Sequence, residues 1–293
     1  MSMIIGHSKI IKFFDRCIEK GTLSHAYIFS GPEQVGKFTV AVNLAEKILS
    51  GNVILGDNLI IVKSEIEEEK GIIKKKDIVI EQVRDLQHSL NLSSGVSAHR
   101  IAIIDEADRM NHKAQNAFLK TLEEANEGVI LILIARDEKK MLTTIASRCQ
   151  KIKFGIVPDC ELEVGISGET KNKQELISLS AGRPGLLLNF INNDSELLFH
   201  KETLQELKRL FSQSVGERFE LAEKMSKDVG MAEKKMNLWI AALRSVVLGQ
   251  NAADKIDRLR ALKLIEGIEE SIGFLHKNNF NSRLLLENLF LNI

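Results

Sequence analysis

A glycine-rich stretch near the start of the sequence has the residue types and spacing of a phosphate-binding loop. Gly31, Gly36 and Lys37 occupy the fixed positions of the pattern GxxxxGK, directly after the apolar run 26–30. In such a loop, backbone amides and the start of the next helix hold phosphates, and the lysine reaches the outer ones. The residues predict a nucleotide-binding site, although a tight strand-to-helix turn kept for its shape would use the same residues.

The residue after the lysine departs from this pattern. A serine or threonine hydroxyl normally follows the lysine and coordinates Mg²⁺, but Phe38 has no such group. Thr39 carries a hydroxyl one position later, about 100° further round a helix. We therefore expect a degenerate site, with Thr39 among its residues, for which ATP or ADP with Mg²⁺ is a candidate ligand and hydrolysis is disfavoured.

Two carboxylates follow another apolar run. Asp105 and Glu106 come directly after residues 101–104, Ile-Ala-Ile-Ile. In an ATPase with a phosphate loop, such an aspartate holds Mg²⁺ and such a glutamate polarises the attacking water. The alternative is a pair of acidic residues favoured by a helix dipole. Together with the upstream loop, the pair predicts a P-loop fold with Asp105 at the carboxyl edge of the sheet, beside the loop.

The pattern of apolar residues predicts the elements that position these groups. Predicted helices cover residues 4–20, 37–49, 80–92 and 113–124. Predicted strands cover residues 26–30, 101–104 and 129–135. Strands that alternate with helices are typical of a doubly wound α/β domain with a parallel sheet. The charged stretch 63–76 should form an exposed loop or hairpin.

The β pattern fades after residue 154, and the rest of the chain has helical spacing. Two short helices are expected over residues 173–192, broken at residues 182–185 by Gly-Arg-Pro-Gly. We therefore predict an α/β P-loop domain over residues 1–156, a small helical lid over 157–196 and an all-helical domain over 197–293.

Composition limits the partners and the compartment. Lys and Arg number 40 and Asp and Glu also number 40, so no global basic field would drive strong nonspecific binding to DNA. Cys17, Cys149 and Cys160 are scattered without CxxC spacing, which argues against a zinc site or a disulfide framework. The sequence has neither a signal-peptide pattern nor an apolar run long enough to span a membrane. We expect a cytoplasmic protein.

Four stretches resemble one known family. HAYIFSGPEQVGK (25–37), IIDEADRMNHKAQNAFLKTLEE (103–124) and TIASRCQ (144–150) are similar, in this order, to the AAA+ clamp-loader subunits of the bacterial DNA polymerase III holoenzyme. Residues 281–289, NSRLLLENL, are similar to the closing helix of the delta-prime type. The resemblance implies an AAA+ domain, a lid and a helical collar that joins a hetero-oligomeric ring.

The resemblance also implies a role for Arg148. In the family, the Ser-Arg-Cys motif supplies an arginine finger, whose planar cation acts in trans on ATP held by a neighbouring subunit. The implied partners are gamma/tau-type and delta-type subunits, the sliding clamp and primed DNA. An ordinary surface or salt-bridged arginine is the alternative interpretation of Arg148.

Several positions depart from the subunits that hydrolyse ATP. Ala135 followed by Arg136 stands where those subunits usually carry a polar sensor, and Gly185 stands where their lid carries a sensor arginine, two residues after Arg183. Residues 50–76 lack the zinc-binding cysteines of many relatives, so no zinc is expected. These departures favour a delta-prime-type stator without ATPase activity of its own over a gamma/tau-type motor that uses Lys37, Asp105 and Glu106.

Three basic residues lie on or beside the predicted helix 113–124. Arg109, Lys113 and Lys120 are candidates for facing DNA in a channel shared among subunits. Charges on a solvated helix face are the alternative interpretation.

Overall fold

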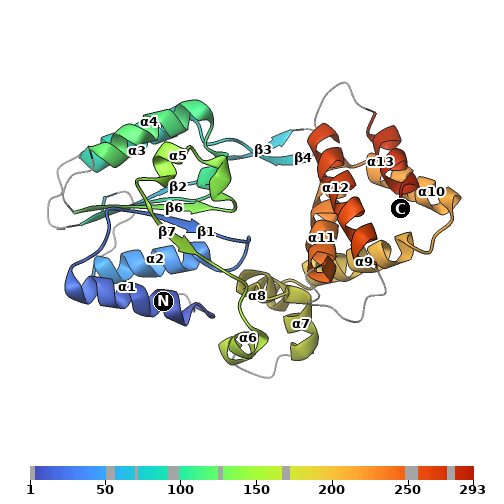
Figure 1. Ribbon diagram of the computed structural model, residues 1–293, viewed down its shortest axis with the longest axis horizontal. Helices are drawn as coiled ribbons and strands as arrows, with labels where there is room; N and C mark the ends of the chain where they lie inside the picture. The colour runs from blue at the N-terminus through green and yellow to red at the C-terminus, as the bar shows by residue number, and fades with distance from the viewer. Residues whose placement is uncertain are drawn as a thin grey trace. The chain divides into compact units, whose positions relative to one another are not determined.

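The structure is a computed structural model that describes residues 4–50, 57–69, 72–91, 99–124, 128–166, 172–247, 257–275 and 281–293 (Figure 1). The chain divides into two compact units. The first comprises Met1–Glu67 and Lys74–Asn192, and the second comprises Glu68–Ile73 and Asn193–Ile293. The predicted lid thus belongs to the unit that contains the sheet, and the predicted division into three domains stays a prediction.

In the described residues, the first unit is built on a five-stranded parallel sheet with the order β2-β5-β6-β1-β7. Its strands are β1 (Ala26–Ser30), β2 (Leu59–Val62), β5 (Arg100–Ile104), β6 (Val129–Ala135) and β7 (Gln150–Lys153). Every residue of β1, β5 and β6 is buried. A parallel sheet covered on both faces explains why these strands are continuous apolar runs. The prediction of a parallel α/β sheet is confirmed.

Helices cover both faces of the sheet (Figure 1). They are α1 (Ser8–Lys20), α2 (Lys37–Ile48), α3 (Ile80–Asn91), α4 (His112–Glu123) and α5 (Thr143–Ala146). Because successive strand residues point to opposite faces, Tyr27 and Phe29 pack with α1 and α2, whereas Ala26 and Ile28 pack with α3, α4 and α5. The two apolar layers hold the strand ends in register.

The predicted start of the first helix is wrong by four residues. The apolar spacing predicts a helix from Ile4, but α1 begins at Ser8. Gly6 and His7 both have positive φ, 81° and 59°, so the chain turns before the helix starts. The His7 ring contacts the glycine-rich stretch 31–37, since its Nε2 lies 2.7 Å from the carbonyl oxygen of Val35.

Three helices follow the sheet within the first unit, as far as the structure describes it: α6 (Asp159–Gly165), α7 (Lys173–Ser180) and α8 (Pro184–Asn192). The predicted pair of short helices over 173–192 is confirmed, whereas the sequence pattern does not predict α6. A Cβ atom on Gly165 would lie 2.5 Å from the Ile5 side chain, and one on Gly182 2.8 Å from that of Ile156. Close backbone approach therefore fixes these helices against the rest of the unit.

The charged stretch 63–76 contains β3 (Ile66–Glu69) and β4 (Ile72–Lys75), which pair in a separate small sheet. Of the two predicted alternatives, an exposed loop or a hairpin, the structure has the two paired strands of a hairpin. Lys76 and Glu67 form an exposed ion pair at its base, with 2.9 Å between Nζ and Oε1.

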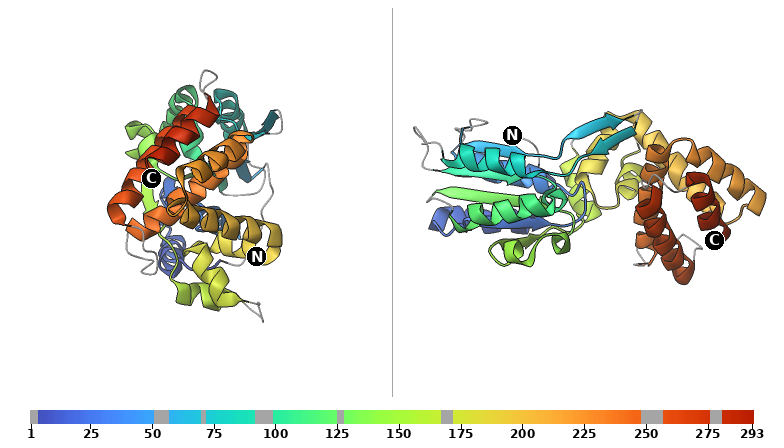
Figure 2. Two further views of the ribbon diagram at one scale, coloured as in Figure 1. Left: turned by 90° about the vertical axis from the view of Figure 1, so that its right-hand side faces the viewer. Right: turned by 90° about the horizontal axis from the view of Figure 1, so that it is seen from above.

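The second unit is helical in the described residues, as the ribbons coloured from gold to red show (Figure 2). Its helices are α9 (Asp194–Leu210), α10 (Val215–Ser226), α11 (Val229–Val247), α12 (Arg258–Leu275) and α13 (Ser282–Leu291). The Trp239 and Phe290 rings lie 6.0 Å apart in its core, and Trp239 Nε1 donates to the carbonyl oxygen of Thr203 at 2.9 Å. The prediction of an all-helical region after the lid is confirmed. None of the described helices is long and apolar enough to cross a membrane.

Candidate functional site

The phosphate loop lies between β1 and α2, as the GxxxxGK pattern predicts. Gly31 and Gly36 have φ of 146° and 100°, and α2 begins at Lys37. The first amides of a helix have no partner within the helix and are available to an anion. A Cβ atom on Gly31 would overlap the carbonyl oxygen of Phe154, just after β7, whereas a Cβ atom on Gly36 would meet nothing within 4 Å. The two glycines are therefore required for different reasons.

This difference predicts unequal costs for two matched substitutions. Gly36→Ala should destabilise the first unit by about 1–2 kcal/mol, the cost of positive φ for an L-residue. Gly31→Ala should cost about 1–3 kcal/mol more, because an added methyl group must also displace backbone. Calorimetric unfolding measures both. Trp239, the chain's one tryptophan, lies in the second unit, so its fluorescence serves as an internal control. Equal destabilisation by the two variants would contradict the predicted contact with Phe154.

The lysine of the loop is held inside it. Lys37 is only 7% exposed, and its Nζ donates to the carbonyl oxygens of Gly31 and Pro32 at 2.5 and 2.6 Å. Burial lowers the pKa of Lys37, against the opposing effect of nearby carboxylates, first Glu33 of the loop and then Asp108 and Asp105 of the acidic motif. The fold thus brings the loop and the acidic motif into one electrostatic environment, although β6 separates their strands.

Asp105 follows β5 at the carboxyl edge of the sheet. Its amide donates to the carbonyl oxygen of Val62 at 2.8 Å, and its Oδ1 accepts from the amide of Glu106 at 3.1 Å. Burial raises the pKa of the Asp105 carboxyl, while the charge of Lys63 opposes the rise. Asp105 therefore lies where a metal-holding carboxylate is expected, with a lysine as its charged neighbour.

The Glu106 carboxylate is engaged by two other side chains. Oε1 forms an ion pair with Lys75 of β4, and Oε2 accepts from Ser64 Oγ at 2.5 Å. Burial would raise the pKa of Glu106, but the hydrogen bonds from Lys75 and Ser64, with the charge of Lys75, lower it. A carboxylate stabilised in this way is a weaker general base, because its affinity for a proton has fallen.

Phe38 and Lys63 lie where an active phosphate-loop ATPase binds Mg²⁺. Phe38 lies in the first turn of α2, and Lys63 Nζ lies 4.0 Å from the centre of its ring. An ammonium group over a ring face is attracted by the ring's quadrupole. Thr39, half-buried on α2, supplies the nearest hydroxyl in sequence. Neither a phenyl ring nor an ammonium group offers the oxygen ligands that Mg²⁺ requires, so this part of the site does not fit Mg²⁺.

The two sensor positions make contacts with the loop that the sequence did not reveal. Arg136, directly after β6, forms an ion pair of 2.5 Å with Glu33 of the loop, and its amide donates to Asp108 Oδ1 at 3.3 Å. The Gly185 amide donates to the carbonyl oxygen of Gln34 at 2.8 Å. A Cβ atom on Gly185 would lie 2.9 Å from that oxygen. An arginine at position 185 would therefore require the lid to move away from the loop.

Arg148 lies at the edge of the sheet that the amino ends of the strands form, opposite the carboxyl edge that carries the phosphate loop. It precedes β7, whose first residue, Gln150, pairs in parallel with Tyr27 of β1. Arg148 is thus beside the amino end of β1, whereas the phosphate loop follows the carboxyl end, about 13 Å away at ~3.3 Å per strand residue. The guanidinium is exposed and contacts Glu123 at 2.9 Å and the carbonyl oxygen of Thr144 at 3.0 Å.

Cys149, next to this arginine, is buried, and burial raises the pKa of its thiol to about 12. The thiol therefore stays protonated at neutral pH and contributes to packing, because the thiolate is the reactive form.

The three basic residues proposed to face DNA have different surroundings. Arg109 Nη2 donates to the carbonyl oxygen of Lys75 at 2.5 Å and so supports the base of the hairpin. Lys113 and Lys120 are exposed on α4, and Lys120 lies 3.9 Å from Glu124. The two lysines are seven residues apart and so share one side of the helix.

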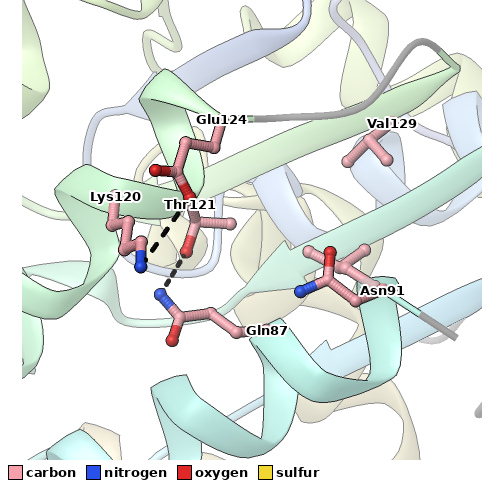
Figure 3. A pocket seen from close by; sticks show the side chains of 7 residues that line it. Gln87, Asn91, Lys120, Thr121, Glu124 and Val129 are labelled. Atoms are coloured by element: carbon pink, nitrogen blue, oxygen red, sulfur yellow. Dashed lines mark hydrogen bonds and ion pairs between the residues drawn. The ribbon is translucent and has the colours of Figure 1, made fainter.

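A cavity between α3 and α4 lies away from the phosphate loop (Figure 3). Its volume is about 140 Å³, and Val129 at the amino end of β6 forms part of its wall. Gln87 Nε2 donates to Thr121 Oγ1 at 2.9 Å and to the carbonyl oxygen of Ala117 at 3.0 Å. These polar groups are mutually bonded, and ligand pockets are usually larger, about 300 Å³ or more.

In the part of the chain that the structure describes, no group of three or more His, Cys, Asp or Glu side chains could hold a metal ion. The expectation that the protein lacks structural zinc stays a prediction.

The comparison with known proteins identifies the family. A family model described as "DNA polymerase III, delta subunit" matches residues 6–157, more than half of the 293 residues. Over 153 residues the chain is 31% identical to DNA polymerase III subunit delta' of Bacillus subtilis, covering 50% of this chain and 46% of that protein. Over 162 residues it is 29% identical to subunit tau of the same organism, covering 52% of this chain and 28% of that protein.

The chain spans about half the length, or less, of these curated relatives. Among solved structures, a DNA polymerase III gamma subunit-related protein from Thermotoga maritima has a TM-score of 0.56 and 19% identity, covering 96% of this chain and 97% of that one. This likeness concerns the fold alone. The matched family model shows that the chain belongs to the DNA polymerase III delta-subunit family, among the AAA+ clamp-loader proteins of bacteria.

Proposed function

We propose that this protein is a delta-prime-type subunit of the clamp loader, a stator that presents Arg148 in trans to ATP held by a neighbouring gamma/tau-type subunit. Its other partners are a delta-type subunit, the sliding clamp and primed DNA. The observation that carries the proposal is the position of Arg148, exposed and at the opposite edge of the sheet from the chain's own phosphate loop.

The Arg148 side chain can exchange its contacts within the chain for contacts with another subunit at little cost in free energy. Its contacts within the chain are an exposed ion pair with Glu123 and a hydrogen bond to the carbonyl oxygen of Thr144. Exposed ion pairs of this kind contribute about 0–1 kcal/mol. The triphosphate of a neighbouring subunit carries more negative charge than one carboxylate and can accept bidentate hydrogen bonds from the guanidinium. The charge of the phosphates therefore favours contact of the Arg148 guanidinium with the neighbouring site over its contact with Glu123.

The chain's own phosphate loop is better suited to binding a nucleotide, or to a structural role, than to hydrolysing ATP. Phe38 provides no metal ligand, and Glu106 is paired with Lys75 and Ser64. Arg136 is paired with Glu33, so it is engaged with the loop itself. An ATPase motor needs a metal and a group that orients the attacking water, and these contacts compete with both requirements.

We expect the purified chain to show no ATP turnover above background with Mg²⁺ and primed DNA, and Lys37→Ala to leave this result unchanged. The reason is that Phe38 provides no metal ligand and that Glu106, paired with Lys75, is a weaker general base. A coupled phosphate-release assay measures the rate. Turnover that is lost in Lys37→Ala would instead identify a gamma/tau-type motor that uses Asp105 and Thr39.

Contact with primed DNA is proposed to be shared among the subunits of the ring. The equal numbers of basic and acidic residues argue against strong binding by this chain alone. Lys113 and Lys120, exposed on α4, and Arg109 are the candidates for its part of that surface.

A further inference from the structure

Lys63 lies between the two halves of the nucleotide site. It directly follows Val62, the last residue of β2, and Val62 pairs in parallel with Ile104, the last residue of β5. Lys63 and Asp105 therefore leave neighbouring strands at matching positions on the carboxyl edge of the sheet. On the other side, the Lys63 ammonium lies 4.0 Å from the centre of the Phe38 ring.

Phe38 and Asp105 occupy the two positions that hold Mg²⁺ in an active phosphate-loop ATPase. There, the hydroxyl after the lysine and the aspartate at the strand end coordinate the metal. Here the hydroxyl is replaced by a ring whose face attracts a cation, and that cation is an amine of the same chain. Lys63 is also the charged neighbour with the largest effect on the Asp105 carboxyl.

We propose that the Lys63 ammonium takes the place of Mg²⁺ at this loop, so that the site holds the phosphates of a nucleoside diphosphate without a metal ion. The substitution of Phe38 for a hydroxyl then has a positive role, because the ring face positions the lysine. This proposal stands independently of the role of Arg148 in trans.

The charges near the loop favour a diphosphate. The phosphates would meet the first amides of α2, the amine of Lys37 after it leaves the carbonyl oxygens of Gly31 and Pro32, and the amine of Lys63. A lysine supplies one positive charge where Mg²⁺ supplies two. Glu33, in the loop, is already paired with Arg136, so its charge is partly compensated. The two lysine amines thus compensate the charge of ADP more fully than that of ATP.

Calorimetric titration of the full chain with ADP, once with Mg²⁺ and once with EDTA, tests the proposal. We expect the two affinities of the unchanged protein to agree within about twofold, since Lys63 is present in both buffers and contributes a charge-assisted contact. Lys63→Ala should weaken ADP binding in EDTA by about tenfold, as expected for loss of one hydrogen bond to a charged group. Lys12→Ala, an exposed lysine on α1, is the control of equal charge and should bind like the unchanged protein.

The double variant Phe38→Thr with Lys63→Ala restores the hydroxyl and removes the built-in cation. We expect its ADP binding to depend on Mg²⁺, improving about tenfold or more on addition of the metal, because Thr at position 38 and Asp105 would complete the usual ligand pair. Circular dichroism of each variant checks that the fold is kept.

Three results would overturn the proposal. They are an affinity of the unchanged protein that rises tenfold with Mg²⁺, an affinity of Lys63→Ala equal to that of the unchanged protein, and no ADP binding in either buffer. All three are measured on the isolated chain, whereas the role of Arg148 is measured on the assembled ring. Failure of one proposal is therefore distinguishable from failure of the other.

Discussion

Replacing Arg148 with alanine is expected to lower the DNA-stimulated ATPase of the assembled clamp loader while leaving the fold of this subunit intact. At the interface that it serves, an arginine finger contributes about 10³-fold or more to the rate, because it stabilises charge that develops on the phosphates. Other interfaces keep their own fingers, so the steady-state rate of the whole ring should fall by less, roughly three- to tenfold.

The measurement is ATP hydrolysis by a ring reconstituted with gamma/tau-type and delta-type subunits, the clamp and primed DNA. Arg84→Ala is a matched control, since Arg84 is an exposed arginine on α3 of the same unit. Arg148→Lys keeps the charge but loses the planar fork, and we expect it to remain well below the unchanged ring. A ring with Arg148→Ala that hydrolyses ATP at the unchanged rate would rule out the trans role.

Replacing Trp239 with alanine is expected to destabilise the helical unit by about 3–5 kcal/mol, the usual cost of deleting a buried tryptophan. The indole is fully buried, packs 6.0 Å from the Phe290 ring and donates from Nε1 to the carbonyl oxygen of Thr203. These contacts join α11 to α13 and α9. Removal of the indole leaves a cavity and removes one of the hydrogen bonds that the Thr203 carbonyl oxygen accepts.

Calorimetric unfolding is the appropriate measurement, because it does not depend on the fluorescence of the residue that is removed. Trp239→Phe is the control: it keeps an aromatic ring beside Phe290 but loses the hydrogen bond to Thr203, so it should cost less than alanine. If both variants unfold at the same temperature as the unchanged protein, the indole is not the centre of this core. The first unit should keep its own transition in either case, since Trp239 lies in the second unit.

The strands that the sequence predicts well are those buried along their whole length. β1 and β6 have the predicted bounds and β5 starts one residue earlier, because a continuous apolar run has one stable place, between two layers of helices. The apolar pattern misses β7 because Gln-Lys-Ile-Lys lies at the sheet edge with most of its side chains exposed. The apolar pattern also misses β2, because this strand has only four residues and directly precedes the charged hairpin.

The candidate residues of the site are predictable from the order of residues along the chain, but their contacts are not. GxxxxGK and the Asp-Glu pair are local patterns with fixed spacing, so the amino-acid sequence is enough to name Lys37, Asp105 and Glu106. The pairing of Glu106 with Lys75, of Arg136 with Glu33, and of Lys63 with Phe38 joins residues far apart in sequence. Such pairs form only because parallel strands bring their carboxyl ends to one edge.

The order of residues along the chain is therefore enough to predict the family, the α/β and all-helical parts of the chain, and the positions that depart from an active ATPase. The contacts that these positions make are visible only in the folded chain. There, the Lys37 amine is directed at the loop's own carbonyl oxygens, Gly185 lies against Gln34, and Arg148 is at the far edge of the sheet. The physical reason is that apolar periodicity specifies which elements form, whereas the partner of each charge depends on which strand ends the folded sheet makes neighbours.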